Sequence, residues 1–406
     1  MRRRHSTAIR TAALLLVTAG ALSSCSTGPP PAPSPSADAC GTAAPAGPVD
    51  TWTAAPARLS GPYQDKTIRE VVHTSIGGTS VRLRLSNVFG TTAVRFGSVW
   101  AGAQSDGAGL VAGSNQRVRF GGAESATVAA GAEVVSDPVD LTVRPGENLT
   151  VSIHVDGGTG DVTGHLRAQQ HGWYADGDAG ADPSAARYTH QVDRWFWLDA
   201  VTVQPSRPAR TVVALGDSIT DGFHSTVDAN HRWPDYLAAR LGPCSRFGVA
   251  NEGIAGNRVT ANGSGVSAEA RLQRDVLAQP GAGTLIYLEG INDIDSTVKA
   301  ADQLIQADQK IVARAHVAGL RVIGGTITPF EGYHTYSSAT EGIRESVNSW
   351  IRDSRTFDTV ADFDAALRDP ADPHRLAGRY DSGDHLHPGD AGYQVMAGVV
   401  PLDALG

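Results

Sequence analysis

A serine follows directly on an apolar run at residues 212–222, which read VVALGDSITDG. Ser218 stands among glycine, aspartate and threonine, immediately after residues typical of a buried strand. Its hydroxyl could attack a carbonyl carbon, but a serine hydroxyl is a weak nucleophile unless a neighbouring base removes its proton. The segment therefore predicts a nucleophilic serine, provided that the rest of the chain supplies the base.

The strongest candidate for that base lies in the segment DSGDHLHPGDAGY, residues 381–393. Asp384 precedes His387 by three residues, so that its carboxylate can hold the ring through Nδ1–H and leave Nε2 free to accept the serine proton. His385 is the competing base, but it is adjacent to Asp384, a spacing that is poor for orienting the ring. We therefore predict a triad of Ser218, His387 and Asp384. We predict no metal, since His385 and His387 lack an evident third zinc ligand.

Two further segments offer hydrogen-bond donors for the negative oxygen that develops when a carbonyl is attacked. Residues 251–258 read NEGIAGNR and contain glycines whose backbone N–H groups can approach a substrate closely. Residues 290–294 read GINDI and supply the side-chain amide of Asn292. Removing one such donor typically costs about 10²–10³ in rate. Asp217 and Asp293 are expected to hold loops by hydrogen bonds rather than to transfer protons.

These residues lie between segments that alternate in character from residue 205 onward. Runs of strand length read TVVAL (211–215), FGVAN (247–251), TLIYLE (284–289), RVIGGTI (321–327) and TVADF (359–363). Helical spacing is found between them at 233–241, 268–279, 301–319 and 340–353. The alternation predicts an α/β domain over residues 205–406, with a parallel sheet covered by helices on both faces. Ligands of such sheets bind at the carboxyl ends of the strands, where Ser218 lies.

Residues 50–204 have a different sequence pattern, in which short apolar segments are separated by turn-forming glycines. The stretch VRLRL at 81–85 alternates apolar and charged residues, as a half-buried strand does. Gly77 and Gly78 separate the segments 69–76 and 79–87 and predict a hairpin. Many short strands predict an all-β sandwich, of jelly-roll type, that forms its own pair of layers.

The first 25 residues predict a targeting segment rather than part of the fold. Arginines precede an apolar stretch that is shorter than the roughly 20 residues of a membrane-spanning helix. The stretch ends in LSSC at 22–25, which looks like a bacterial lipobox and predicts lipid attachment at Cys25; ordinary signal cleavage nearby is the alternative. Residues 26–49 are rich in Pro, Ala and Ser and predict a solvated linker. We expect a secreted protein that contacts the membrane only through an anchor at Cys25.

The chain has three cysteines, Cys25, Cys40 and Cys244. If Cys25 carries a lipid, the other two remain as one pair in an oxidising compartment, where disulfides persist. We therefore expect a disulfide between Cys40 and Cys244. Such a bridge would join the early part of the chain to the later domain.

Four segments together resemble the sequence blocks of the GDSL esterase/lipase family, the SGNH hydrolases, over roughly residues 211–400. The matching positions are Gly216-Asp217-Ser218-Ile219, with Ile in place of the eponymous Leu, then Gly256, then Gly290-x-Asn292-Asp293, and finally Asp384-x-x-His387-Pro388. The resemblance implies a flavodoxin-like, three-layer α/β/α fold with five parallel strands. It also implies an oxyanion hole formed by the backbone N–H groups of Ser218 and Gly256 and by the Asn292 side chain. Within the family, the chain is most similar to secreted actinobacterial members with an N-terminal β-domain, some of them associated with polysaccharides.

Composition and charge narrow the range of partners. The chain has 406 residues and a formal net charge of −8, without a basic stripe that would neutralise nucleic-acid phosphates. We expect a monomeric serine esterase that needs no cofactor and hydrolyses short-acyl esters, such as acetyl groups on a polysaccharide. One alternative is a lipase or phospholipase of the same family, although the polar segment at 223–232 does not resemble an apolar lid. Another is a surface carbohydrate-binding protein with weak esterase activity.

Overall fold

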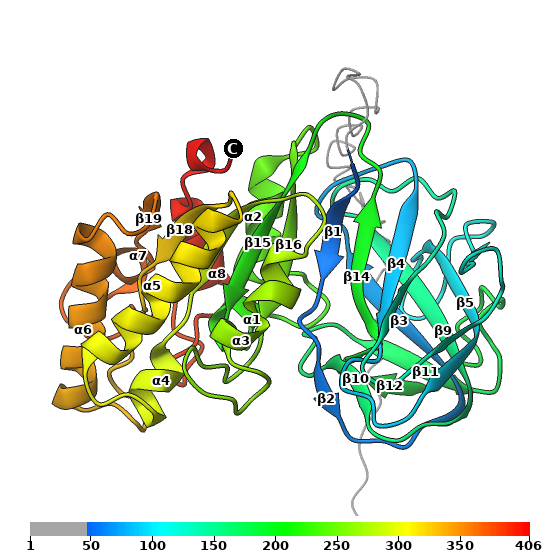
Figure 1. Cartoon of the computed structure of the whole chain (residues 1–406), viewed down its shortest axis with the longest axis horizontal. Helices are drawn as coiled ribbons and strands as arrows, with labels where there is room; N and C mark the ends of the chain where they lie inside the picture. Colours follow the sequence, from blue (N-terminus) through cyan, green and yellow to red (C-terminus); the bar gives the residue numbers. More distant parts are fainter. Residues whose placement is uncertain (1–46) are drawn as a thin grey trace, which may run out of the picture.

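The computed structural model describes residues 47–406 and shows a β-rich region beside an α/β region (Figure 1). The predicted signal segment and most of the predicted linker, with Cys25 and Cys40, lie outside the described residues. Cys244 is disulfide-bonded, and its predicted pairing with Cys40 stays a prediction. None of the helices within residues 47–406 combines the length and the apolar character that a bilayer crossing requires.

Three antiparallel sheets build the β-rich region. The first contains β1 (Val49–Thr53), β14 (Leu198–Val203), β4 (Val81–Ser86) and β8 (Glu133–Val135), in spatial order. The second contains β12 (His190–Val192), β11 (Gly172–Asp176), β3 (Gln64–His73), β9 (Asn148–Gly158), β5 (Val94–Ala103) and β6 (Gln116–Arg117), with β7 (Ala126–Val128) also on β5. The third contains β13 (Trp195–Phe196), β10 (Val162–His165) and β2 (Ala57–Leu59). Buried side chains of all three sheets share one hydrophobic core.

The predicted hairpin across Gly77 and Gly78 is wrong. β3 pairs with β9 and β11, whereas β4 pairs with β14 and β8, so the two segments lie in different sheets. The glycines let the chain cross between these sheets in close contact with other backbone, because a Cβ at Gly78 would lie 2.6 Å from the carbonyl oxygen of Gln204. The alternating pattern predicts strands correctly here but does not say which strands pair.

The α/β region contains a sheet of five parallel strands. Their spatial order is β16 (Phe247–Gly253), β15 (Arg210–Gly216), β17 (Ala282–Leu288), β18 (Arg321–Gly325) and β19 (Thr359–Ala361). This is the 2-1-3-4-5 order of flavodoxin-like sheets, which confirms the expected α/β fold. The helical segments are α1 (Ser218–Asp221), α2 (Trp233–Leu241), α3 (Ala268–Leu272), a π-helical turn η2 (Gln273–Leu277), α4 (Ile291–Ser296), α5 (Ala301–Val317), α6 (Ser338–Asp353), α7 (Phe363–Leu367), α8 (Asp390–Val399) and η3 (Leu402–Ala404).

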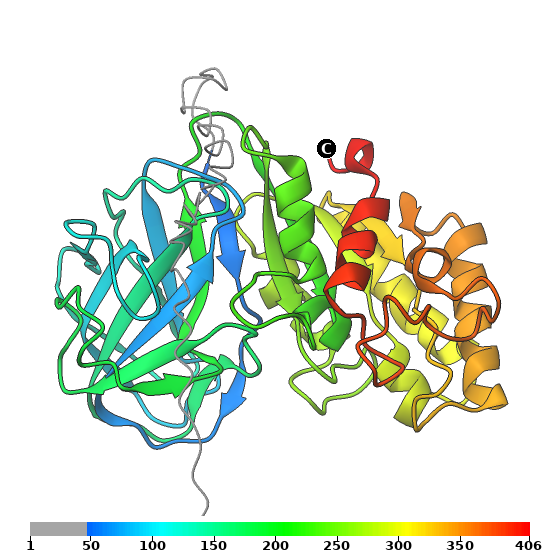
Figure 2. The same cartoon turned by 180° about the vertical axis from the view of Figure 1, so that it is seen from behind.

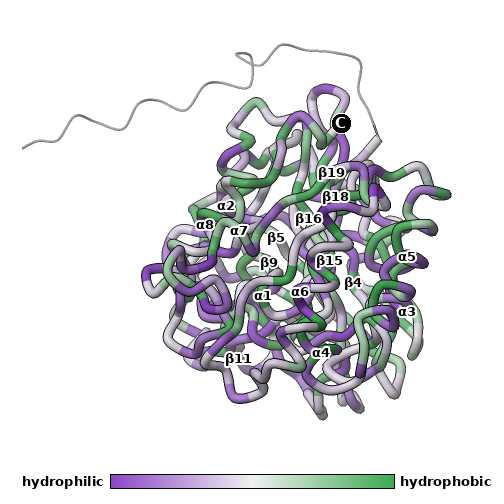
Figure 3. The backbone as a smooth tube through the Cα atoms, turned by 90° about the vertical axis from the view of Figure 1, so that its left-hand side faces the viewer, coloured by the Kyte–Doolittle hydropathy of each residue, from purple (hydrophilic) through white to green (hydrophobic). Residues whose placement is uncertain are grey.

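Helices cover both faces of this sheet, because successive strand residues point to opposite faces (Figures 1 and 2). On β15, Val213 and Leu215 belong to the core that also contains buried residues of α3, α5 and α6. Val212 and Ala214 belong to the core under α2, α7 and α8. The outer helices are amphipathic, and hydrophobic and hydrophilic stretches alternate along α5 (Figure 3).

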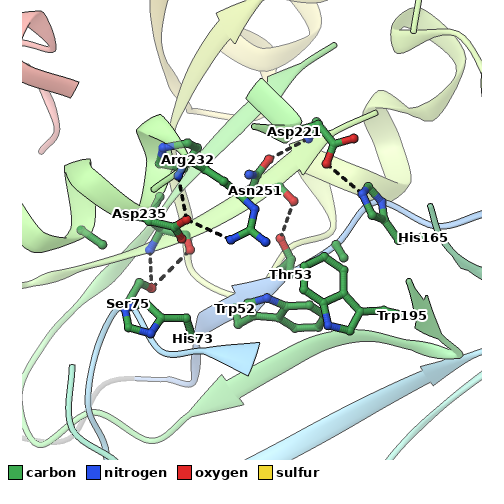
Figure 4. Close-up of a pocket in the computed structure, with 15 residues that line it drawn as sticks. Trp52, Thr53, His73, Ser75, His165, Trp195, Asp221, Arg232, Asp235 and Asn251 are labelled. Carbon is green, nitrogen blue, oxygen red and sulfur yellow. Dashed lines mark hydrogen bonds and ion pairs between the residues drawn. The ribbon is translucent and has the colours of Figure 1, made fainter. Parts of the chain in front are cut away.

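Side chains of the β-rich region cover β16, the edge strand of the parallel sheet. The Ser75 hydroxyl accepts a hydrogen bond from the Val249 N–H at 2.8 Å and lies 3.2 Å from the Val249 carbonyl. Thr53 donates to the Asn251 carbonyl at 3.2 Å. These contacts satisfy backbone groups that an uncovered edge would leave unpaired. A cavity of about 30 Å³ at this interface has room for water rather than for a substrate (Figure 4).

Candidate active site

The structure brings the three predicted triad side chains into one hydrogen-bonded chain. Ser218 begins α1 immediately beyond the carboxyl end of β15, and Asp217 caps this short helix by accepting from the Ile219 N–H at 2.9 Å. The Ser218 Oγ lies 2.8 Å from Nε2 of His387. The Nδ1 of His387 lies 2.6 Å from a carboxylate oxygen of Asp384. This arrangement lets the imidazole take the serine proton while the carboxylate holds the ring.

Asp384 is held in its ionised form by the groups around it. Its other carboxylate oxygen accepts from the backbone N–H groups of Leu386 and His387, at 3.0 and 2.9 Å. Partial burial would raise the pKa of Asp384, but the hydrogen bonds from His387 and Leu386 outweigh burial and hold this pKa well below its usual range. The carboxylate therefore stays negative and can stabilise an imidazolium at His387.

The other histidines near the site are placed differently. His385, the competing base, bonds through Nδ1 to Asp381 at 2.7 Å, and its side chain is 54% exposed. His224 was not singled out from the sequence, yet its Nε2 lies 3.4 Å from the Asp384 carboxylate. Nothing in the polar segment 223–232 marks this residue in advance, because the contact forms only when that loop meets the loop of Asp384.

The three predicted oxyanion donors line the same cavity as Ser218 and His387. The N–H groups of Ser218 and Gly256 form no backbone hydrogen bond within the part of the chain that the structure describes. Gly256 has φ +78°, and a Cβ there would lie 2.7 Å from the Ser264 Oγ, so the position requires glycine. The Asn292 amide donates one hydrogen to the Asn257 carbonyl at 2.9 Å, which fixes its orientation and leaves its second hydrogen for a ligand.

The loop that carries Gly256 is fixed by buried polar groups. The Asp293 carboxylate accepts from the N–H groups of Val259 and Thr260 at 2.8 and 3.0 Å. Asp217 also holds its loop, and burial raises the pKa of this carboxyl to about 6. Both acids thus hold loops by hydrogen bonds, as expected from the sequence, while the expectation that they transfer no proton stays a prediction.

Arg271 is a buried residue beside the site that the sequence analysis does not single out. This side chain is 1% exposed and donates to the carbonyls of Gly216 and Glu252, at 3.0 and 2.7 Å. It also donates to the Asn257 side-chain oxygen at 3.0 Å, and it lies 3.1 Å from Asp275. The arginine thereby joins the ends of β15 and β16 to the loop that carries Gly256. Nothing in the sequence of the segment 268–279 distinguishes Arg271 from the other charged residues there.

The cavity above Ser218 has a volume of about 680 Å³ and is bounded by both regions of the protein. The β-rich region contributes Ala57, Arg58, Phe89, His165, Leu166 and Arg167. The sequence predicts a separate pair of layers for residues 50–204 and does not predict that this region lines the cavity. The β-rich region therefore forms part of the site.

Two groups of described residues could hold a metal ion by distance, namely His224, Asp384 and His387, and Glu341, Glu345 and His374. In the first group, Asp384 and His387 bond each other, and His387 bonds Ser218. In the second, Glu341 accepts from Arg344 at 2.6 and 2.9 Å. Protein groups thus already bond several of these ligand atoms. The expectation that the reaction needs no metal or cofactor stays a prediction.

Residues 214–395 match the model of a family described as GDSL-like Lipase/Acylhydrolase. No curated protein matches the chain. Similar solved structures include a member of the lipolytic protein G-D-S-L family from Veillonella parvula, which is 20% identical over 47% of this chain and 96% of that chain, with a TM-score of 0.37. The carbohydrate acetylesterase Est24 from Sinorhizobium meliloti is 16% identical over 46% of this chain and 94% of that chain, with a TM-score of 0.37. The acetylxylan esterase Axe2 from Geobacillus stearothermophilus is 20% identical over 47% of this chain and 92% of that chain, with a TM-score of 0.37. The actinobacterial type and its N-terminal domain stay predictions. Residues 214–395, which hold Ser218, Gly256, Asn292 and His387, are thus similar to the GDSL-like Lipase/Acylhydrolase family.

Proposed function

We propose that the protein is a serine esterase that forms an acyl-enzyme at Ser218. The observation that carries this proposal is the chain from the Ser218 Oγ through His387 to Asp384, with distances of 2.8 and 2.6 Å. Beside it lie the N–H groups of Ser218 and Gly256, which have no backbone partner within residues 47–406. These groups supply the nucleophile, the base, the orienting carboxylate and the oxyanion donors that acyl transfer requires.

The proposed reaction has two halves. The Ser218 oxygen attacks the ester carbonyl carbon while Nε2 of His387 takes the serine proton. The Ser218 and Gly256 N–H groups and the Asn292 amide hold the negative oxygen. When the bond to the alcohol breaks, His387 gives its proton to the departing oxygen. Water, deprotonated by His387, then releases the acid and restores Ser218.

We propose short acyl groups, such as acetyl esters on a secreted carbohydrate, as the substrate class. A lipase would need an apolar surface around its site to contact a lipid layer. The large exposed apolar side chains within residues 47–406 are scattered, and of these only Leu166 lines the cavity. A series of p-nitrophenyl esters from acetyl to palmitoyl tests the proposal. We expect kcat/KM to be highest at acetyl and to fall with chain length, whereas a maximum at long chains would favour the lipase.

His165 is a positioning residue that connects the β-rich region to the loop of Gly256. Its ring nitrogens lie 2.8 Å from the Ala55 carbonyl and 2.9 Å from the Asp221 carboxylate. Both partners can accept, so the geometry favours hydrogen on both ring nitrogens. Burial alone would lower the pKa of His165, but the Asp221 carboxylate outweighs it and the pKa is raised. The other Asp221 oxygen accepts from the Ala255 N–H at 3.0 Å, next to Gly256 (Figure 4 shows His165 and Asp221).

Replacing His165 by alanine is expected to lower kcat about 10- to 100-fold while KM changes little, because misplaced oxyanion donors act on the transition state. Steady-state kinetics on p-nitrophenyl acetate measure both constants. The control is His154→Ala, which removes a histidine of the same region that bonds Asp65 at 3.0 Å and does not line the cavity. Equal losses of kcat in the two variants would contradict a positioning role for His165.

A further inference from the structure

The wall that the β-rich region contributes makes the cavity cationic. Arg58 and Arg167 line it, and none of its described lining residues is Asp or Glu. The chain as a whole carries a formal net charge of −8. The cavity lining, with two arginines and no carboxylate, is therefore positive in an otherwise negative protein. Low-dielectric walls strengthen the attraction of such a cavity for an anion.

Arg167 stands close to the reacting groups. Its guanidinium carbon lies 4.5 Å from the ring centroid of Phe223, and the Phe223 ring packs edge-on against the His387 ring, at 4.8 Å between centroids. Within residues 47–406, Arg167 makes no ion pair or side-chain hydrogen bond. A cation–π contact of this kind occupies no hydrogen-bond acceptor, so the N–H groups of the guanidinium can still bind a carboxylate or phosphate at two points.

The backbone holds Arg167 at this place against its conformational preference. Its φ is +60°, a left-handed conformation that is uncommon for an arginine. The neighbouring Ala168 is fixed on both sides, since its N–H donates to the Asp193 carbonyl at 2.9 Å and its carbonyl accepts from Arg232 of the α/β region. Strained residues that their surroundings hold in place are typical of functional sites.

Arg58 is less suited than Arg167 to bind a ligand directly. Both arginines are exposed, but the Arg58 guanidinium lies 3.8 Å from the Asp161 carboxylate, whereas Arg167 has no carboxylate partner among the described residues. Arg58 therefore adds attraction at the rim, while Arg167 has the free hydrogen-bond donors.

We propose that the cavity binds esters that carry an anionic group, a carboxylate or a phosphate, and that Arg167 binds that group while Ser218 attacks the ester. This proposal rests on the esterase function proposed above and specifies its substrate class. Two sources share this chemistry, an acylated acidic sugar and a short-chain glycerophospholipid.

The kinetic test compares 4-acetoxybenzoate with its neutral methyl ester, which differ in one charge. The test variant is Arg167→Asn, because asparagine tolerates a left-handed backbone and folding is thereby preserved. We expect the KM for 4-acetoxybenzoate to rise about tenfold, consistent with the loss of a charge-assisted hydrogen bond, and both constants for the methyl ester to stay within about twofold. For Arg167→Lys, the KM for 4-acetoxybenzoate should lie between the values of the natural protein and of Arg167→Asn, since lysine keeps the charge but not the planar guanidinium.

The matched control is Arg95→Gln, which removes an exposed arginine of the same region that does not line the cavity. It should leave both esters unaffected. Equal losses for the two esters in Arg167→Asn, or no change for either, would overturn the proposal.

A binding measurement separates this proposal from the esterase function. Ligand-observed NMR with Ser218→Ala protein should detect 4-hydroxybenzoate more strongly than its methyl ester, and Arg167→Asn should abolish the difference. Anion binding without turnover of any ester would support the subsite and refute only the esterase, whereas equal binding of the two probes would overturn the subsite. Acetylated oligogalacturonide and dihexanoyl glycerophospholipid then form the two substrate arms. If the protein hydrolyses one of these two substrates and Arg167→Asn does not, the result supports the anion site and shows which kind of anionic ester it binds.

Discussion

Replacing Ser218 by alanine is expected to lower kcat for p-nitrophenyl acetate by about 10⁶-fold, the loss seen when the nucleophile of such a triad is removed. The hydroxyl is the atom that must bond to the acyl carbon, and the Ser218 Oγ is the atom that lies 2.8 Å from the His387 ring. The remaining donors would still bind the carbonyl oxygen, so KM should change little. Rates at several enzyme concentrations, corrected for spontaneous hydrolysis, measure the loss.

Two further measurements make this result specific. Ser346→Ala removes an exposed hydroxyl on α6 that bonds the Gly342 carbonyl, and it should retain full activity. A fluorophosphonate probe should add its mass to a peptide that contains Ser218 in the natural protein and to none in Ser218→Ala. If Ser218→Ala keeps more than about one hundredth of the natural kcat, Ser218 is not the nucleophile.

Elements with strong local patterns were predictable from the sequence. The helix at 233–241 has the bounds of α2, and each predicted parallel strand overlaps one of β15 to β19. These elements depend on the spacing of apolar residues within a few turns or pleats, which the sequence displays directly. Pairing in the β-rich region depends on contacts between distant segments, and there the same reasoning wrongly joins the segments on either side of Gly77 and Gly78.

The site residues also fall into those that the sequence predicts and those that it does not. Ser218, Gly256, Asn292, Asp384 and His387 stand in short motifs. In the structure, four of these residues line one cavity, and Asp384 bonds the fourth, His387, without lining that cavity itself. The residues that orient and enclose them have no such local signature. Arg271 bonds the ends of two strands and one loop, and Arg167 and His165 reach the site only because the β-rich region packs against β16. A single sequence does not show contacts of this range.

Replacing Arg271 by methionine is expected to lower the free energy of unfolding by about 3–5 kcal/mol, the range for breaking a buried ion pair from one side. Methionine fills much of the volume, but it leaves the carbonyls of Gly216 and Glu252 without this donor. It also leaves Glu289 without the cation 3.5 Å away, in a place where burial already raises the pKa of that carboxyl well above its ordinary value. Urea denaturation followed by circular dichroism measures the change.

A matched variant distinguishes lost stability from a lost active-site geometry. Arg344 is also buried, at 3% exposure, and bonds Glu341, Asp364 and the Ile327 carbonyl, but none of these groups lines the cavity. Arg344→Met should therefore cost a similar free energy of unfolding. At a temperature where both variants are folded, Arg271→Met should lose about 100-fold in kcat, because the loop of Gly256 is released, whereas Arg344→Met should lose no more than a few-fold. If the two variants lost activity equally, Arg271 would stabilise the fold without positioning the oxyanion donors.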